Sequence, residues 1–158
     1  MMRLAIVGPG RWGRILVEAV QGISETVTFT HAVARSPAKA AAWCAAQDLS
    51  LSDDLSAALA DPDIDGIVLA TPHSQHKDQL IQVAKAGKAL FCEKPAALTR
   101  TSVEAAIEVI KGVGVVFCGR PQPPLPARNW ADESDDRGWR SGQDPACRRQ
   151  HEQPCRLW

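Results

Sequence analysis

Three glycines near the N-terminus have the residue type and spacing that bind a dinucleotide. Gly8, Gly10 and Gly13 form a G-x-G-x-x-G pattern. In such a pattern the first glycine permits a tight turn, the second lets the backbone approach a pyrophosphate, and the third lets a helix pack closely on a strand. The pattern lies between the aliphatic run Leu4–Val7 and a helical pattern over residues 15–20, which is the context that binds phosphate. It therefore predicts a dinucleotide site, with a plain structural turn as the alternative.

The residue after the second predicted strand bears on the choice of cofactor. An acidic side chain there hydrogen-bonds the ribose 2′-hydroxyl of NAD. In this chain the position falls on Arg35, next to Ser36. Because a guanidinium suits a 2′-phosphate, the sequence favours NADP over NAD. The alternative is an exposed arginine followed by a helix-capping serine.

A lysine at a predicted strand end has the chemistry of an acid–base group. Glu93-Lys94-Pro95 follows the short apolar run Ala89–Cys92. We expect this tripeptide at the carboxyl edge of a parallel sheet, where open α/β sheets bind ligands. Beside a nicotinamide, the Lys94 ammonium could polarise a hydroxyl or carbonyl and stabilise a developing alkoxide. The alternative is a strand-end lysine that extends into solvent.

Strands and helices alternate along residues 1–117. This alternation predicts an α/β fold of the Rossmann type, a doubly wound parallel sheet with helices on both faces. Apolar runs predict strands at residues 4–7, 27–34, 67–70, 89–92 and 113–117. Capping residues and terminal glycines predict helices at about 15–20, 37–47, 55–60, 74–86 and 101–112. Two of these helices are expected to begin at Ser36, before Pro37, and at a capping box over residues 101–104.

The glycines and the lysine belong to a longer set of motifs. "AIVGPGRWG", "ATPHSQH" and "AGKALFCEKPAALT" follow one another along the chain. In this order and spacing, residues 3–117 resemble the Gfo/Idh/MocA family of NAD(P)-dependent oxidoreductases. The resemblance implies that Lys94 contacts the reacting hydroxyl of a sugar or cyclitol and takes part in catalysis, and that Glu93 contacts the nicotinamide riboside. It further implies a small-molecule, sugar-like substrate, a second α/β domain and a homo-oligomeric parent protein.

The expected cofactor site combines these assignments. It draws on the glycine-rich turn, the end of the second strand, the loop after the fourth strand and the E-K-P motif. Its members are Gly8, Gly10, Arg11, Trp12, Gly13, Arg35, Ser36, Thr71, Pro72, His73, Glu93 and Lys94. Trp12 either pads the cofactor or packs beneath the turn, and packing is favoured. We expect His76, in the first turn of the following helix, to be structural rather than catalytic.

The composition changes after Phe117. Residues 118–158 contain no Ile, Val, Phe or Lys, yet they hold six of the eleven prolines, seven of the twelve arginines and three of the five tryptophans. Back-translated and read one nucleotide later, this tail permits the family-like sequence A-A-G-H-N-R-R-F-L-P-A. We therefore predict a dinucleotide-binding domain over 1–117 and an out-of-frame, disordered tail over 118–158, with the second domain missing and little or no turnover. A genuine Pro/Arg-rich disordered tail is the alternative.

Charge and cysteine content narrow the functional classes. Eighteen basic and eighteen acidic residues give a net charge of zero, which argues against nucleic-acid and anionic-membrane partners. The five cysteines lack metal-type spacing, and the N-terminus lacks a secretory pattern, so we expect a cytoplasmic protein without a metal site. Two other classes stay open, since a fold does not fix a function. One is a non-catalytic NAD(P)-sensing regulator, and the other is a nucleotide-binding module whose tail recruits a partner.

Overall fold

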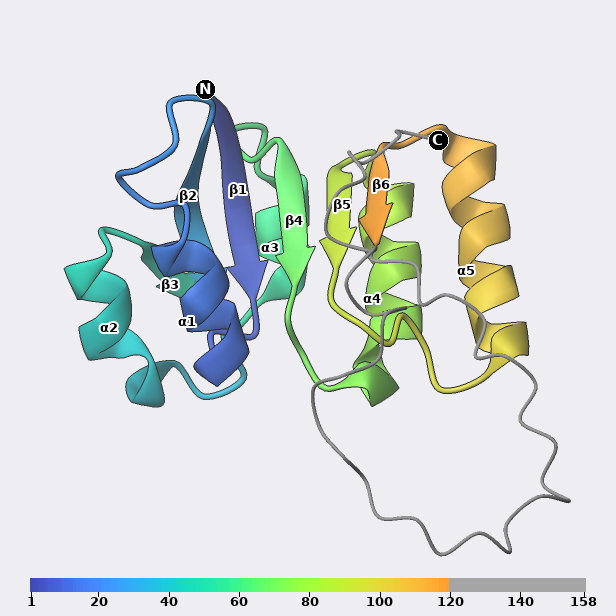
Figure 1. The fold of residues 1–158 in the computed structure, drawn as a ribbon, viewed down its shortest axis with the longest axis horizontal. Coiled ribbons are helices and arrows are strands. Elements are labelled where there is room, and N and C mark those ends of the chain that lie inside the picture. The colour runs from blue at the N-terminus through green and yellow to red at the C-terminus, as the bar shows by residue number, and fades with distance from the viewer. Residues whose placement is uncertain (120–158) are drawn as a thin grey trace, which may run out of the picture. The chain divides into compact units, whose positions relative to one another are not determined.

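Short aliphatic runs form the centre of a parallel sheet in the computed structural model, which describes residues 1–119. Within these residues one six-stranded sheet has the order β3-β2-β1-β4-β5-β6 (Figure 1). The strands are β1 (Met2–Val7), β2 (Val27–Val33), β3 (Ser50–Ser52), β4 (Gly66–Leu69), β5 (Ala89–Cys92) and β6 (Phe117–Gly119). All neighbouring pairs are parallel. The order reverses between β1 and β4, which is the doubly wound Rossmann arrangement, so the predicted fold class is confirmed.

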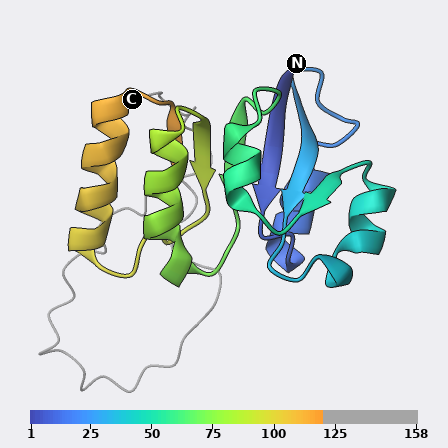
Figure 2. The same ribbon diagram turned by 180° about the vertical axis from the view of Figure 1, so that it is seen from behind.

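Helices cover both faces of the sheet. They are α1 (Arg11–Glu18), the 3-10 helix η1 (Pro37–Lys39), α2 (Ala41–Ala46), α3 (Leu55–Ala60), α4 (His73–Lys85) and α5 (Arg100–Val113). On β1, Ile6 packs with α1 and α2, whereas Ala5 and Val7 pack with α3, α4 and α5. Figure 2 shows the last three helices in front of the sheet. Because successive strand residues face opposite sides, a strand covered on both faces must be apolar throughout.

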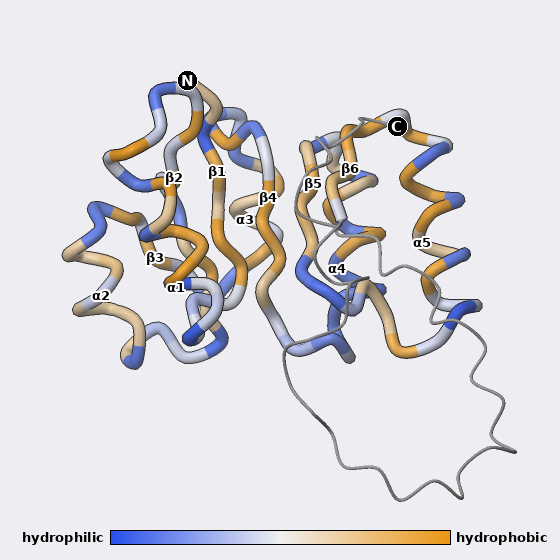
Figure 3. Tube along the Cα trace, in the orientation of Figure 1, coloured by the Kyte–Doolittle hydropathy of each residue, from blue (hydrophilic) through white to orange (hydrophobic). Residues whose placement is uncertain are grey.

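Hydropathy follows this arrangement. Figure 3 shows apolar residues concentrated along the central strands β1 and β4. All four residues of β4 are buried. In the part of the chain that the structure describes, no helix is long and apolar enough to cross a membrane.

Two helix predictions need correction. The helix expected over 37–47 is divided into η1 and α2, because the Ala40 N–H bonds to the Pro37 carbonyl in a tighter 3-10 turn, and the Ser36 side chain makes no capping hydrogen bond. The capping box over 101–104 does not form. Instead Thr99 caps α5, its Oγ1 accepting from the Ser102 N–H at 3.2 Å, while Glu104 pairs with Arg100.

Two strand predictions also need correction. The last strand comprises Phe117–Gly119 rather than residues 113–117, because α5 continues to Val113 and ends at Gly114, whose φ of 75° reverses the chain. The short strand β3 was not predicted, since Ser50–Ser52 has no apolar run and pairs only with β2. From residue 120 on, the predicted out-of-frame tail lies outside the described residues.

Candidate cofactor and substrate site

Four strands end at one level and so form a single edge. Their last residues are register partners: Val7 with Val33 and with Leu69, and Leu69 with Cys92. The loops that leave this edge stay attached to the neighbouring strand through backbone hydrogen bonds. These bonds are Gly8 N–H to Val33 O at 2.9 Å, Ala70 N–H to Val7 O at 2.9 Å, and Glu93 N–H to Leu69 O at 3.0 Å. The glycine-rich turn and the E-K-P motif, far apart in sequence, therefore leave the same edge.

Each glycine of the turn has a distinct geometric reason to be glycine. Gly8 has a φ of +89°, and a Cβ there would lie 2.9 Å from the Ala70 carbonyl oxygen. A Cβ on Gly13 would collide with the Gly8 carbonyl oxygen, so α1 packs directly on the turn. A Cβ on Gly10 would meet nothing within 4 Å. The first and third glycines thus serve the fold, whereas Gly10 borders open space.

The N-terminus of α1 faces that open space without a side-chain cap. Gly10 occupies the N-cap position and no side chain accepts a hydrogen bond from the first turn. The N–H groups of the first turn have no partner within the helix, and the positive end of the helix dipole lies there. Arg11, the first helical residue, is exposed. Uncapped donors beside an unfilled position fit the pyrophosphate of a dinucleotide.

The segment after β2 carries exposed cations. Arg35, Ser36 and Lys39 are all exposed. Arg14 fastens this segment to the glycine-rich turn, since its Nε donates to Pro9 O at 3.2 Å and its Nη2 donates to Lys39 O at 3.4 Å. Sequence reasoning missed Arg14, because neither carbonyl partner is visible in a sequence pattern.

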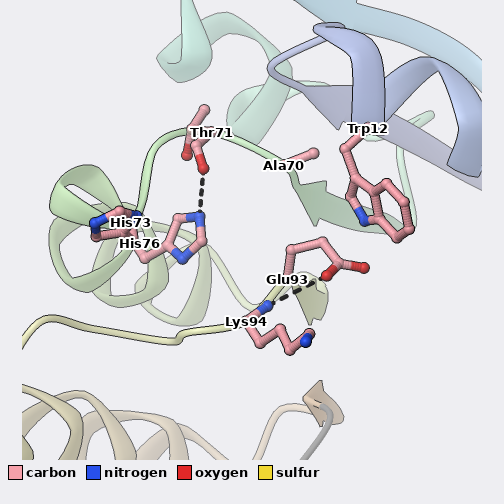
Figure 4. Close-up of a pocket in the computed structure, with 7 residues that line it drawn as sticks. All are labelled: Trp12, Ala70, Thr71, His73, His76, Glu93 and Lys94. Carbon is pink, nitrogen blue, oxygen red and sulfur yellow. Dashed lines mark hydrogen bonds between the residues drawn. The ribbon is translucent and has the colours of Figure 1, made fainter. Parts of the chain in front are cut away.

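A cleft of about 410 Å³ opens at the carboxyl edge of the sheet (Figure 4). Its lining comprises Trp12, Ala70, Thr71, His73, His76, Glu93 and Lys94. Five of these are predicted site residues, while Ala70 and His76 were not assigned to the site. The other predicted members (Gly8, Gly10, Arg11, Gly13, Arg35, Ser36 and Pro72) lie outside the lining.

Trp12 contradicts the interpretation that favoured packing. Its side chain is 53% exposed and borders the cleft rather than filling space beneath the turn. In Figure 4 the Glu93 carboxylate extends toward the indole. A flat aromatic surface at this place can contact a bound ring. The position of Trp12 within the glycine-rich motif was the sequence signal for this orientation.

Lys94 presents an unpaired ammonium to the cleft. The residue is exposed, and among residues 1–119 its side chain takes part in no ion pair. Its backbone N–H donates to Glu93 Oε2 at 3.3 Å. The ammonium is therefore available for a hydroxyl or carbonyl oxygen of a bound molecule.

His76 lies at the base of the cleft and is 1% exposed. Its Nδ1 is 2.7 Å from the Pro95 carbonyl oxygen, and its Nε2 is 2.7 Å from the Thr71 carbonyl oxygen. The Thr71 hydroxyl in turn donates to Gln79 Oε1 at 2.5 Å. Burial and backbone contacts agree with the structural role expected for His76.

Cys92, next to Glu93, is a buried thiol rather than a nucleophile. Burial, with a smaller contribution from the Glu93 carboxylate, raises the pKa of Cys92 to about 12. Its Sγ donates to the Glu93 carbonyl oxygen at 3.2 Å. Since the thiolate is the reactive form, Cys92 supports the strand end and supplies no covalent chemistry near neutral pH.

Comparison with known proteins assigns the chain to a family. Residues 2–119 match the GFO_IDH_MocA model, described as an oxidoreductase family with an NAD-binding Rossmann fold. The chain belongs to this family. The resemblance seen in the motifs is thereby confirmed for the Gfo/Idh/MocA family, and the glycine-rich turn, the loop after β4 and the E-K-P motif all fall within the matched residues.

Relatives in the Gfo/Idh/MocA family include cyclitol dehydrogenases. The chain is 36% identical to an inositol 2-dehydrogenase of Rhizobium meliloti (strain 1021), over 69% of this chain and 32% of that protein. It is 34% identical to the scyllo-inositol 2-dehydrogenase (NAD(+)) of Bacillus subtilis (strain 168), over 73% of this chain and 34% of that protein. A solved NAD-binding protein from Listeria innocua has a TM-score of 0.69 and 29% identity, over 75% of this chain and 35% of that one. The chain thus spans about a third of the length of the relatives it matches.

Proposed function

We propose that this chain is the cofactor-binding part of an oxidoreductase that transfers hydride between a nicotinamide dinucleotide and a hydroxyl-bearing carbon of a cyclitol or sugar. The observation that carries the proposal is the cleft, which brings Trp12 from the glycine-rich turn together with Glu93 and Lys94 from the E-K-P motif. The similarity to two inositol dehydrogenases supports the substrate class.

In this proposal the glycine-rich turn holds the pyrophosphate. The unfilled position at Gly10 and the uncapped first turn of α1 supply the room and the N–H donors. The nicotinamide ring would then lie over the cleft, with Trp12 on one side and Glu93 near the riboside. When bound, the cofactor supplies the hydride chemistry, and the protein supplies position and electrostatics.

Lys94 is the group we propose for proton movement. Its unpaired ammonium can donate a hydrogen bond to the substrate oxygen and stabilise negative charge there during hydride transfer. Thr71 and His73 form the opposite wall, along which we place the cofactor. The remaining substrate contacts of such an enzyme would come from residues beyond those described.

We further propose a preference for NADP. The segment after β2 has no acidic residue at positions 34–36 and presents Arg35 and Ser36 to solvent, which suits a 2′-phosphate. The Bacillus subtilis relative is named for NAD(+), so the preference has to be measured on this chain. Exchange of Arg35 for alanine should weaken NADPH about tenfold and leave NADH nearly unchanged. Exchange of Lys111, an exposed cation on α5, is the matched control, and equal losses for both cofactors would contradict the preference.

Fluorescence titration of the purified 158-residue chain with NADPH and NADH tests the proposed function directly. We expect saturable binding of a dinucleotide and little or no turnover of inositols or sugars. A chain that binds neither cofactor would refute the assignment.

Resequencing the gene around the codon of Cys118 tests the proposal that residues 118–158 are read out of frame. An intact reading frame there would exclude it.

A further inference from the structure

His76 connects two loops that border the cleft on different sides. Thr71 belongs to the loop after β4, and Pro95 belongs to the loop after β5. Each contributes a carbonyl oxygen that lies 2.7 Å from one nitrogen of the His76 ring. Within residues 1–119, His76 is the one buried polar side chain.

The hydrogen-bonding role of each His76 ring nitrogen depends on whether that nitrogen carries a proton. A carbonyl oxygen only accepts, so a ring nitrogen bonds to it only if that nitrogen carries a proton. Both contacts are hydrogen bonds when both nitrogens are protonated, whereas a ring with one N–H leaves one carbonyl facing a lone pair. Because the imidazole ring is planar and rigid, the contacts of its two nitrogens fix the separation of the two carbonyl oxygens. The ring is thus a strut between the loops rather than a simple filler of the core.

The strut acts at the residues next to the predicted chemistry. Pro95 directly follows Lys94, and Thr71 directly follows Ala70, whose carbonyl oxygen bounds the position of Gly8. The Thr71 hydroxyl also donates to the side chain of Gln79 on α4, so Thr71 is fixed to this helix by two contacts. The separation fixed by His76 therefore sets where the E-K-P loop lies relative to the loop after β4.

We propose that His76 is a positioning residue for Glu93 and Lys94 at the nicotinamide end of the cleft. This role rests on the proposed cofactor-binding function. It predicts a selective defect, because the glycine-rich turn, which would hold the pyrophosphate, shares no hydrogen bond with His76. Loss of the strut should weaken recognition of the nicotinamide half and spare recognition of the ADP-ribose half.

Matched ligands separate this role from a role in folding alone. The His76→Asn variant of the 158-residue chain would be titrated by calorimetry with NADH and ADP-ribose, and with NADPH and 2′-phospho-ADP-ribose. We expect about a tenfold loss for the dinucleotides and no more than about a twofold change for the ligands without nicotinamide. Val83→Ala, which removes buried atoms from the same helix, is the control for lost stability and should not discriminate between the ligands of a pair.

The outcomes are distinguishable. Equal losses for both members of a pair, or no loss in a folded His76→Asn variant, would overturn the positioning role. Wild-type chain that binds neither member would overturn the proposed function, and the role of His76 in cofactor binding with it. Should His76→Asn fail to fold, the His76→Gln variant would be titrated with the same ligand pairs. Equal losses for both members of a pair in that variant would again overturn the positioning role.

Discussion

The three glycines of the turn should respond differently to alanine, and Gly10 gives the sharpest test of the site. Its φ of −76° and ψ of −169° are extended backbone that any residue can adopt, and an added Cβ meets nothing within 4 Å. The folded chain should therefore tolerate Gly10→Ala. Its free energy of unfolding should be unchanged or raised by up to about 1 kcal/mol, since alanine restricts the unfolded chain.

Dinucleotide binding should nevertheless fall. The added methyl group occupies the space where a pyrophosphate would approach the backbone, and it removes a hydrogen bond to a charged group that contributes about 1.5–3 kcal/mol. The dissociation constant should then rise roughly 10- to 150-fold. Gly13→Ala should behave in the opposite way, because its Cβ meets the Gly8 carbonyl oxygen. Such overpacking costs about 1–3 kcal/mol of stability.

Two measurements on the same samples separate an effect on stability from an effect on dinucleotide binding. Urea unfolding followed by circular dichroism gives the free energy of unfolding, and NADPH fluorescence gives the dissociation constant. Gly112→Ala is the matched control, since its Cβ also meets nothing within 4 Å but lies on α5. A Gly10→Ala chain that binds as tightly as the wild type, or that loses stability, would refute the assignment of this position to the cofactor.

Other predictions concern stability and thiol reactivity. Thr99→Ala should lower the free energy of unfolding in urea by about 1 kcal/mol because Thr99 caps α5, whereas Thr101→Ala should lower it much less. A larger loss for Thr101→Ala would instead support the capping box expected from the sequence. In iodoacetamide labelling of the native chain mapped by mass spectrometry, exposed Cys118 should react and buried Cys44 and Cys92 should not, so early labelling of Cys92 would contradict its burial. The raised pKa of Cys92 means that the folded chain holds this proton above pH 9.0 while the unfolded chain releases it. Between pH 9.0 and about 12 the stability of the wild type should thus fall more steeply than that of Cys92→Ala, by up to about 1.4 kcal/mol per pH unit; parallel pH profiles would exclude this linkage.

Elements with a strong local pattern could be predicted from the sequence. The apolar run at Ala89–Cys92 forms β5 with the expected bounds, and α4 ends just before Gly87, whose φ is +71°. The glycine spacing identified the turn between β1 and α1. These features succeed because burial on both faces and a left-handed backbone each restrict residue type at single positions.

Elements that depend on a neighbour could not be predicted in this way. Ser50–Ser52 is a strand because β2 offers it an unpaired edge, and Cys118 and Gly119 extend the sheet because β5 lies beside them. For both strands, the backbone hydrogen bonds of another segment decide the outcome. Thr99 caps α5 through Ser102, while Glu104 pairs with Arg100 of the same helix.

The sequence by itself determined the family and the alternation of strands and helices, and it nominated the residues that we propose bind a dinucleotide and move a proton. Only the tertiary structure decided that the indole of Trp12 faces the cleft, that Arg14 joins the glycine-rich turn to the segment after β2, and that His76 spans two loops. The reason is physical. A motif restricts the residues at one place in the chain, whereas the distance between two loops is set by strand register and by side chains from other elements, which local sequence does not encode.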